Sequence, residues 1–305
     1  MPETCREIST ILVATDLSEE SAAAIRFGHW LGARLGASVE AAHVIEPLSH
    51  GVLAAAPELE KAHREDAEKK LREFAAANGL EGRTRVHVAT GELVVELLRM
   101  QHQTRADLVL VGRPRGREAM GATGAGMARK MPVSVLVVPP DGVEQVARLG
   151  VATDLTDDSE LGVRRGLKLA HRLGLTEITL LHTYEVPVGY HTIATYDEIC
   201  QRIEKNSRER AEAFAARIQA ELAEGTLQVR MAMADGAPAE AIPKLAGREN
   251  LDLLIISTHG RTGGLSVFVG RKTEKILGRA PCAVWAERSP FLFQTALDAL
   301  GELLR

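Results

Sequence analysis

Short, nearly continuous apolar runs alternate along the chain with longer segments in which apolar residues recur every three to four positions. The short runs are rich in β-branched residues and have the length of strands that are buried on both faces of a sheet, whereas the longer segments have the spacing of amphipathic helices. Strands that alternate with helices pair in parallel through right-handed crossovers, so the pattern predicts an α/β fold with doubly wound parallel sheets. The predicted strands are residues 10–15, 38–44, 85–89, 108–112, 133–138, 149–153, 177–183, 227–232, 252–257 and 282–286.

The clearest helical spacing lies between residues 211 and 222. Apolar residues follow one another there at intervals of three and four positions, which places them in one stripe along a helix. The stripe consists of Ala211, Phe214, Ala215, Ile218 and Leu222. A strongly charged segment at residues 58–74 also has an apolar side, and we interpret its charges as the solvated face of a surface helix.

The chain carries an internal repeat. The sequence VATDL occurs at residues 13–17 and again at 151–155, and each copy is followed by a helical segment that ends in Leu-Gly and by an apolar run that closes on a histidine, His43 or His182. The agreement extends over nearly the whole chain, so we expect two copies of one fold. The predicted boundaries are 1–142 for the first domain, 143–288 for the second and 289–305 for an amphipathic C-terminal helix.

Composition and charge narrow the functional classes. The 305 residues carry a formal net charge of −4, so no global basic field favours nucleic acid, and no recognition-helix module is visible. No apolar run approaches the length of about 20 residues that spans a bilayer, and the N-terminus has no signal-peptide core. Three scattered cysteines fit a reducing cytoplasm, and the dispersed histidines and cysteines predict no metal site.

An aspartate follows the first strand of each repeat, Asp16 in the first and Asp154 in the second. In a doubly wound sheet, ligands bind beyond the carboxyl ends of the strands, so both carboxylates are expected at that edge. A carboxylate there can accept hydrogen bonds from a ribose hydroxyl or an adenine amino group. It can equally accept backbone N–H groups where the next helix begins. The residues alone leave both interpretations open.

Glycines dominate the segment after the fourth strand of the second repeat, with Gly260, Gly263, Gly264 and Gly270. Glycine lets backbone N–H groups approach phosphate oxygens, and a helix that begins near Gly270 would direct its N-terminal amides at the same anion. Arg271 adds positive charge. The segment is therefore a candidate phosphate loop, and it lacks the GxxxxGK[ST] pattern of a P-loop.

The first repeat differs at this loop. Its loop is shorter, and Arg115 stands where the second repeat has Gly260. An arginine cannot offer the same close backbone approach, but its side chain can meet a phosphate. The alternative, which we favour, is an exposed basic loop without a ligand.

These features together resemble the universal stress protein family in its tandem two-domain form. The markers are ILVATDLSEES at residues 11–21, HVIEP at 43–47 and, above all, STHGRTGGLSVFVGRKTEKILGRAPCAV at 257–284. The resemblance implies two adenine nucleotide α-hydrolase-like domains, each with five parallel strands in the order 3-2-1-4-5. It also implies an internal pseudo-dimer of the two domains through their fifth strands, and a cytoplasmic, stress-linked and largely non-enzymatic role.

The ATP-binding members of this family carry the pattern G-x2-G-x9-G-[S/T] after the fourth strand. In this sequence the pattern falls on Ser257, Gly260, Gly270 and Arg271, so the second and third glycines are present. Serine in place of the first glycine reduces backbone freedom. Arginine in place of the closing Ser/Thr removes a small hydroxyl donor and inserts a bulky cation.

The resemblance also assigns residues to the adenosine part of a nucleotide. Asp154 matches the family's nucleotide-contacting aspartate, and Thr183 stands where members usually have a valine against the adenine. In the first domain, Asp16 and Val44 match these two roles. Because the first domain has a shortened loop, the resemblance favours nucleotide binding in the second domain.

Three functions are consistent with these residues. The first is a cytoplasmic stress-response protein that binds ATP or a related adenine nucleotide in its second domain as a regulatory ligand. The second is a nucleotide-free member that acts through protein contacts or another small ligand such as a lipid. The third is an adenylyl-transferring enzyme, which would need an HxGH-type motif that the chain lacks, so we expect no enzyme and leave only slow ATP hydrolysis open. Residues 289–305 are expected to pack on their own chain or to contact a second chain in a homodimer.

Overall fold

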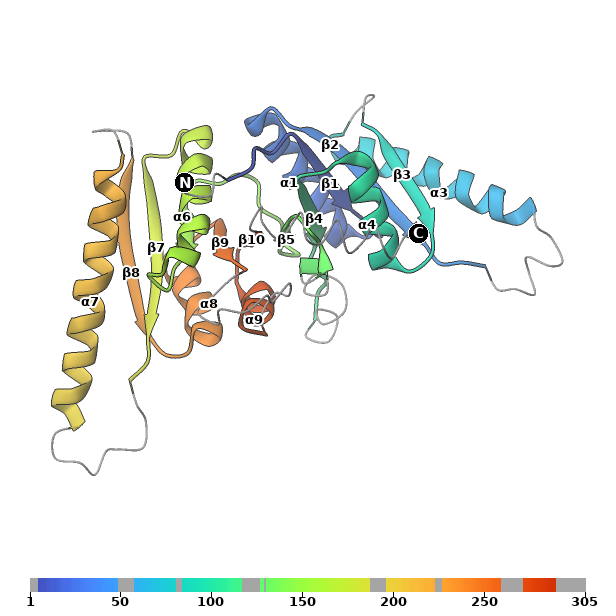
Figure 1. Cartoon of the computed structure of the whole chain (residues 1–305). Coiled ribbons are helices and arrows are strands. Elements are labelled where there is room, and N and C mark those ends of the chain that lie inside the picture. Colours follow the sequence, from blue (N-terminus) through green and yellow to red (C-terminus); the bar gives the residue numbers. More distant parts are fainter. Residues whose placement is uncertain are drawn as a thin grey trace. The chain divides into compact units, whose positions relative to one another are not determined.

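The computed structural model describes residues 5–48, 58–80, 84–116, 127–128, 130–186, 196–222, 227–258 and 271–288. These residues divide into two compact units, which are coloured along the chain in Figure 1. The N-terminal unit comprises the described residues from Arg6 to Gln145. The C-terminal unit comprises Cys5 together with the described residues from Val146 onward. Each unit holds one copy of the sequence repeat.

The described part of the N-terminal unit forms a parallel sheet of five strands with helices packed against it. The strands lie in the order β3-β2-β1-β4-β5, so the chain reverses its direction of winding beside β1. The elements are β1 (Thr10–Ala14), α1 (Glu19–Leu35), β2 (Ser38–Ile45), α3 (Glu58–Ala77), β3 (Val86–Thr90), α4 (Leu93–Thr104), β4 (Leu108–Gly112) and β5 (Ser134–Val138).

The described part of the C-terminal unit has the same architecture. Its strands lie in the order β8-β7-β6-β9-β10, which is again 3-2-1-4-5 when counted within the unit. The elements are β6 (Leu149–Ala152), α6 (Asp157–Leu173), β7 (Glu177–Tyr184), α7 (Tyr196–Ala220), β8 (Gln228–Asp235), α8 (Pro238–Arg248), β9 (Leu253–Ser257), α9 (Arg271–Arg279) and β10 (Ala283–Glu287). The predicted fold class is confirmed.

Most of the observed strand ends lie within one residue of the predicted ones, and the end of β8 differs most. β8 continues three residues past the predicted end at 232, because it stays in register with β7 as far as the pair of Tyr184 and Asp235. The apolar stripe of the predicted helix faces the sheet, and most of its residues are buried. These buried residues are Ala211, Phe214, Ala215 and Ile218.

Glycines at matching positions of the two repeats let a helix approach its sheet closely. A Cβ atom on Gly28 of α1 would lie 2.8 Å from the Val13 Cγ2 atom, and one on Gly166 of α6 would lie 2.5 Å from the Val151 Cγ2 atom. Both distances are too short for non-bonded carbon atoms. Close packing of each helix against the first strand of its unit therefore explains why α1 and α6 both contain a glycine at this position.

Candidate functional site

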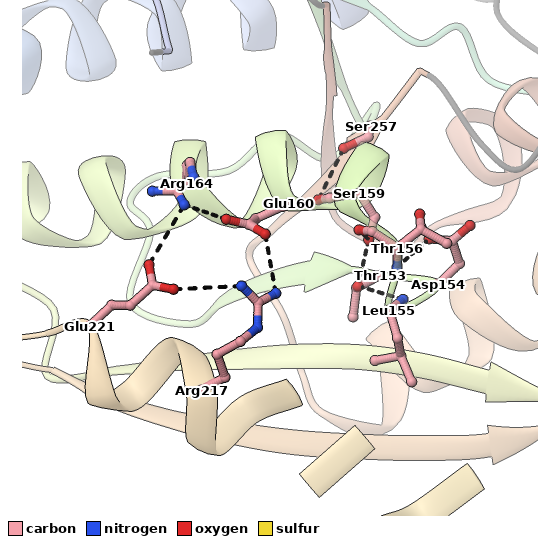
Figure 2. Close-up of polar contacts among 10 residues, drawn as sticks. All are labelled: Thr153, Asp154, Leu155, Thr156, Ser159, Glu160, Arg164, Arg217, Glu221 and Ser257. Carbon is pink, nitrogen blue, oxygen red and sulfur yellow. Dashed lines mark hydrogen bonds and ion pairs between the residues drawn. The ribbon is translucent and has the colours of Figure 1, made fainter. Parts of the chain in front are cut away.

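A tight turn follows β6 and leads into α6 (Figure 2). The Thr153 hydroxyl accepts the backbone N–H of Leu155 at 3.0 Å and bonds to the Ser159 hydroxyl at 2.8 Å. The Asp154 Oδ1 atom accepts the backbone N–H of Thr156 at 3.1 Å and also the Thr156 hydroxyl. Leu155 has a φ of 63°, a left-handed conformation that is costly for a leucine, so the bonds on either side hold the turn in a strained form.

The N-terminal unit repeats this turn between β1 and α1. The Asp16 Oδ1 atom accepts the backbone N–H of Ser18 at 3.0 Å, and Leu17 has a φ of 65°. The Ser18 hydroxyl in turn caps α1 by accepting the backbone N–H of Ser21 at 3.2 Å. Burial would raise the pKa of the Asp16 carboxyl, but the hydrogen bonds from Ser18 and Ser21 outweigh burial and hold that pKa below its usual value. The aspartate thus secures the residue that caps the helix rather than capping the helix itself.

The geometry of Asp154 is compatible with both interpretations made from the sequence. One carboxylate oxygen, Oδ1, closes the turn onto Thr156, the N-cap residue of α6. The other oxygen, Oδ2, makes no hydrogen bond to any residue that the structure describes, and the side chain is only partly buried. Oδ2 is therefore an acceptor that a ligand can use while the turn stays intact.

The two strand-end histidines, His43 and His182, both make hydrogen bonds to the backbone. The His43 Nδ1 atom lies 2.8 Å from the Thr15 carbonyl oxygen, and the His182 Nδ1 atom lies 3.0 Å from that of Thr153. A carbonyl only accepts, so Nδ1 carries the proton in both rings. Burial lowers the pKa of His182, and Arg210 adds to the effect, which together outweigh the opposing influence of the Thr153 carbonyl. Each histidine fixes the start of the turn that carries the aspartate.

Ser257, the last residue of β9, is attached to α6. Its hydroxyl accepts the backbone N–H of Gly162 at 3.0 Å. It also donates to the Ser159 carbonyl oxygen at 3.4 Å (Figure 2). Ser257 stands at the first position of the predicted phosphate pattern. Its side chain is thus already hydrogen-bonded to α6, the helix that follows the Asp154 turn. The sequence gives no sign of this contact, because Ser257 and Gly162 lie 95 positions apart.

The two units place the glycine differently where the first helix packs on the end of the fourth strand. In the C-terminal unit a Cβ atom on Gly162 would lie 2.6 Å from the Ser257 Oγ atom, so a glycine faces a serine. In the N-terminal unit the corresponding residues are Ala24 and Gly112, and a Cβ atom on Gly112 would lie 2.7 Å from the Glu20 carbonyl oxygen. The small residue stands on the helix in one unit and on the strand in the other.

Gly260 and Gly270, the central glycines of the predicted loop, lie outside the described residues. The predicted helix start near Gly270 is confirmed, because α9 begins at Arg271. On the other side of the loop, Thr258 is held by the end of β10. Its backbone N–H and its hydroxyl both donate to the Glu287 carbonyl oxygen, at 3.1 and 3.0 Å.

Thr183 and Val44 lie one residue beyond the two histidines, near the ends of β7 and β2. Both side chains are partly exposed. Because β7, β6 and β9 are adjacent parallel strands, Thr183, Asp154 and Ser257 all come at the carboxyl edge of the same three strands. In the N-terminal unit the same topology brings Val44 and Asp16 to the corresponding edge.

Arg115 of the N-terminal unit is exposed, as expected for a basic loop, but its charge is compensated. Its Nη2 atom lies 3.1 Å from Asp141 Oδ1, and its Nε atom lies 3.5 Å from Glu20 Oε1. Glu20 belongs to the first turn of α1, so the guanidinium is drawn toward the start of that helix. This compensation was not predicted, since Asp141 follows β5 and is distant from Arg115 in sequence.

Comparison with known proteins establishes the family that shares these features. A model of the Universal stress protein family matches residues 7–139 and matches again at residues 146–288. The chain belongs to the universal stress protein family. A universal stress protein of Thermus aquaticus is 31% identical over 108 residues, which cover 35% of this chain and 74% of that relative. A universal stress protein of Methanocaldococcus jannaschii is 20% identical over 152 residues, covering 49% of this chain and 86% of that relative.

Solved structures match this tandem universal stress protein over nearly its full length. A universal stress protein from Archaeoglobus fulgidus covers 92% of this chain and 98% of its own, with a TM-score of 0.61 and 18% identity. A protein of unknown function from Pseudomonas aeruginosa covers 97% and 98%, with a TM-score of 0.64 and 14% identity. At these identities the likeness demonstrates the fold alone.

A closed ring of four ion pairs distinguishes the C-terminal unit of this universal stress protein. Glu160, in the first turns of α6, contacts Arg164 and lies 3.1 Å from Arg217 of α7, while Glu221 lies 3.6 Å from Arg164 and 3.5 Å from Arg217 (Figure 2). Burial would raise the pKa of Glu160, but the bonds from Arg217 and Arg164 outweigh it and hold that pKa below its usual value. The ring fastens α7 to the helix that begins at the Asp154 turn.

The N-terminal unit has no such ring among its described residues. Alanine (Ala22) occupies the position of Glu160, and Arg26 donates to the amide oxygen of Asn78 at 2.6 Å. The sequence contains the i, i+4 pairs on each helix, but it gives no sign that the two helices meet. The ring is therefore a contact that only the tertiary structure reveals.

Replacing Arg217 by glutamine is expected to lower the free energy of unfolding by roughly 1 kcal/mol at low salt, because Glu160 and Glu221 each lose a cation. The difference should shrink as salt screens the ring. The difference in stability should also vanish at acidic pH. The ring contributes its full stability above the pKa of glutamate in the unfolded chain, about 4.3. That contribution is lost as the pH falls through the lower pKa that Glu160 has in the folded protein. Urea unfolding at several pH values measures this. Arg26→Gln is the matched control, and an equal salt dependence in both variants would contradict the interpretation.

A second ion pair is buried inside the C-terminal unit. The Arg165 Nε atom donates to Glu287 Oε1 at 2.9 Å, and Trp285 Nε1 donates to Glu287 Oε2 at 2.6 Å. Arg165 also lies over the Trp285 ring, with its Cζ atom 5.3 Å from the ring centroid. Arg165 is 5% exposed and Glu287 is 1% exposed, so neither charge is solvated.

Cys5 packs against α6 in the C-terminal unit although it precedes the first repeat in the sequence. Its thiol donates to the Leu161 carbonyl oxygen at 3.5 Å, and its own carbonyl accepts Lys168 Nζ at 2.9 Å. Burial raises the pKa of the thiol, and Glu287 adds to the effect, so the thiol stays protonated at neutral pH.

Two kinds of feature are absent from the described part of the chain. No group of three histidine, cysteine or acidic side chains is arranged there to hold a metal ion. No helix there is both long enough and apolar enough to cross a membrane.

Proposed function

We propose that this chain is a cytoplasmic stress-response protein whose C-terminal unit binds ATP or a related adenine nucleotide as a regulatory ligand. The observation that carries the proposal is the Asp154 turn. Its strained backbone is held by Asp154 Oδ1, while Oδ2 has no partner among the described residues. A partly exposed carboxylate at the carboxyl edge of the sheet is suited to accept a ribose hydroxyl or an adenine amino group.

The proposal assigns roles to the other residues of the site. Thr183 comes at the end of the neighbouring strand and would lie against the adenine. The loop with Gly260 and Gly270 would surround the phosphates, and Arg271, as the first residue of α9, adds positive charge near the start of that helix. Ser257 would act on the loop indirectly, because its hydroxyl is bound to α6.

The proposal restricts the nucleotide to the C-terminal unit. The N-terminal unit repeats the aspartate turn with Asp16 and Val44, but its loop carries Arg115, which is already paired with Glu20 and Asp141. A phosphate would have to compete with these two carboxylates for the guanidinium. One bound nucleotide per chain is therefore the expected stoichiometry.

Asp154→Asn is the variant that tests this site with the least disturbance. An asparagine keeps a side-chain oxygen to close the turn, but it places an NH₂ donor where the second carboxylate oxygen, Oδ2, stood. We expect ATP affinity measured by titration calorimetry to fall about tenfold or more, because a hydrogen bond to a charged acceptor is lost.

Asp16→Asn is the matched control for this experiment. It makes the same change in the turn of the N-terminal unit and should leave the affinity unchanged. Absence of any heat with ATP at millimolar concentration, or an equal loss in both variants, would contradict the proposal. A second variant, Gly260→Val, should weaken ATP binding by disturbing the loop, and phosphate release that is lost in this variant would add slow hydrolysis to the regulatory role.

A nucleotide-free role through protein contacts or a lipid is the second candidate. It is favoured by the Ser257 hydroxyl, which is engaged by Gly162 and Ser159 where the ATP-binding pattern has a glycine. Mass spectrometry of the purified protein under native conditions distinguishes the two roles. A mass shift equal to one nucleotide supports the first candidate, and a co-purified lipid supports the second.

A further inference from the structure

β8 is the outermost strand of the sheet in the C-terminal unit, so one edge of its backbone is not paired with a strand of that unit (Figure 1). The backbone N–H groups of Gln228 and Gly236 donate to β7 and its continuation, to Thr176 and Tyr184, both at 2.8 Å. Residues alternate in direction along a strand. The backbone groups that point away from β7 therefore belong to Val229, Met231, Met233 and Asp235.

Side chains occupy this outer edge on both sides of Met231. The Gln219 side chain of α7 accepts the Val229 N–H at 2.8 Å and donates to the Leu227 carbonyl oxygen at 2.9 Å, as a neighbouring strand would. Arg248 donates to the Met233 carbonyl oxygen at 3.1 Å. Protection of this kind limits pairing at sheet edges. Within the part of the chain that the structure describes, the outward N–H and C=O groups of Met231 have no such partner.

A cavity of about 380 Å³ lies along this open position. Strand residues 230–233 line it, together with Arg208 and Glu212 of α7 and with Arg248 and Glu249 at the end of α8. Each helix thus contributes one cation and one carboxylate to the rim. Arg208 and Glu212 are one helical turn apart, on the same side of α7.

We propose that this edge is a contact surface at which two copies of the chain pair, with their β8 strands antiparallel about a two-fold axis through Met231. In an antiparallel hydrogen-bonded pair, two facing residues exchange both N–H···O bonds, which matches the single residue left open on each strand. The contact would be isologous, so every residue near the axis meets the symmetry mate of its neighbour.

The mixed charges at the rim of the cavity suit a second copy of the chain better than a peptide that is uniformly acidic or uniformly basic. A two-fold axis between Arg208 and Glu212 sets the Arg208 of one copy against the Glu212 of the other, and the reverse. An acidic or a basic peptide would meet a like charge on both helices. Gln219 and Arg248 keep the strand contact short, so the affinity should be modest and depend on salt.

Charge reversal on α7 tests this geometry. Sedimentation velocity of the full chain, from micromolar to submillimolar concentration at low salt, should show a monomer–dimer equilibrium. Arg208→Glu should raise the dimer dissociation constant about tenfold or more, because symmetry creates two like-charge pairs. The double variant Arg208→Glu/Glu212→Arg exchanges the signs, keeps the surface self-complementary and should restore the dimer.

Lys70→Glu, on α3 of the N-terminal unit, is the control that changes the net charge by the same amount. It should leave the dissociation constant unchanged. A wild-type chain that stays monomeric over the whole concentration range overturns the proposal. So does a dimer that is indifferent to Arg208→Glu, or a double variant that remains as weak as the single one.

Discussion

Arg165→Leu is expected to destabilise the C-terminal unit by about 3–5 kcal/mol, the largest effect of any single change considered for this chain. The substitution removes the arginine that lies beside the buried Glu287 carboxylate, and removing one partner of a buried ion pair is strongly destabilising because the other charge stays in the core. Glu287 is 1% exposed, so water cannot replace the guanidinium without opening the core. Urea unfolding followed by circular dichroism measures the loss.

The N-terminal unit supplies the control for this prediction. At the positions of Arg165, Trp285 and Glu287 it carries Phe27, Leu136 and Val138, all buried. Replacing the three polar residues together by phenylalanine, leucine and valine removes the charge, its counter-charge and the indole N–H at once. Most of the stability should return, since apolar residues often replace a buried ion pair without loss. A triple variant as unstable as Arg165→Leu would mean that the cost arises from packing rather than from the loss of the cation beside Glu287.

Gly162→Ala is expected to destabilise the same unit by about 1–3 kcal/mol, although alanine favours a helix over glycine by about 1 kcal/mol. The added Cβ atom would lie 2.6 Å from the Ser257 Oγ atom, and it would displace the hydrogen bond between the Gly162 N–H and that hydroxyl. Urea unfolding of the variant again gives the magnitude.

Ser257→Gly should rescue the Gly162→Ala variant. The double variant reproduces the pair Ala24 and Gly112 of the N-terminal unit, where the methyl group stands on the helix and the strand residue is bare. A double-mutant cycle should therefore give a favourable coupling of about 1–2 kcal/mol. Strict additivity of the two changes would show that the clash inferred from the Cβ position is relieved elsewhere.

The fold was predictable from the sequence because its signals are local. Apolar runs such as 108–112 are confirmed as β4 without any shift, and the glycine segment ends at a helix that begins with Arg271. For Asp154 the sequence left two interpretations open, a helix-start acceptor and a nucleotide contact. Only the structure shows that Oδ1 accepts both hydrogen bonds from Thr156 and that Leu155 is held at a positive φ.

The remaining features depend on residues that are distant in sequence. The Arg165–Glu287 pair spans 122 positions, and the contact between Arg217 and Glu160 spans 57. The spacing of apolar residues along the chain does not predict contacts between side chains so far apart in sequence. A comparison of the two repeats holds a partial signal, because Phe27 opposite Arg165 marks an apolar core position that has become charged. That signal identifies the position but not its partner.

The most direct test of a nucleotide in the C-terminal unit is a titration of the ¹⁵N-labelled protein with ATP, followed by its amide resonances. The account predicts saturable shifts at the backbone N–H groups of Leu155, Thr156 and Thr183, with Leu17 and Ser18 of the matching N-terminal turn unmoved. Shifts confined to Leu17 and Ser18, or no shift at millimolar ATP, would contradict it.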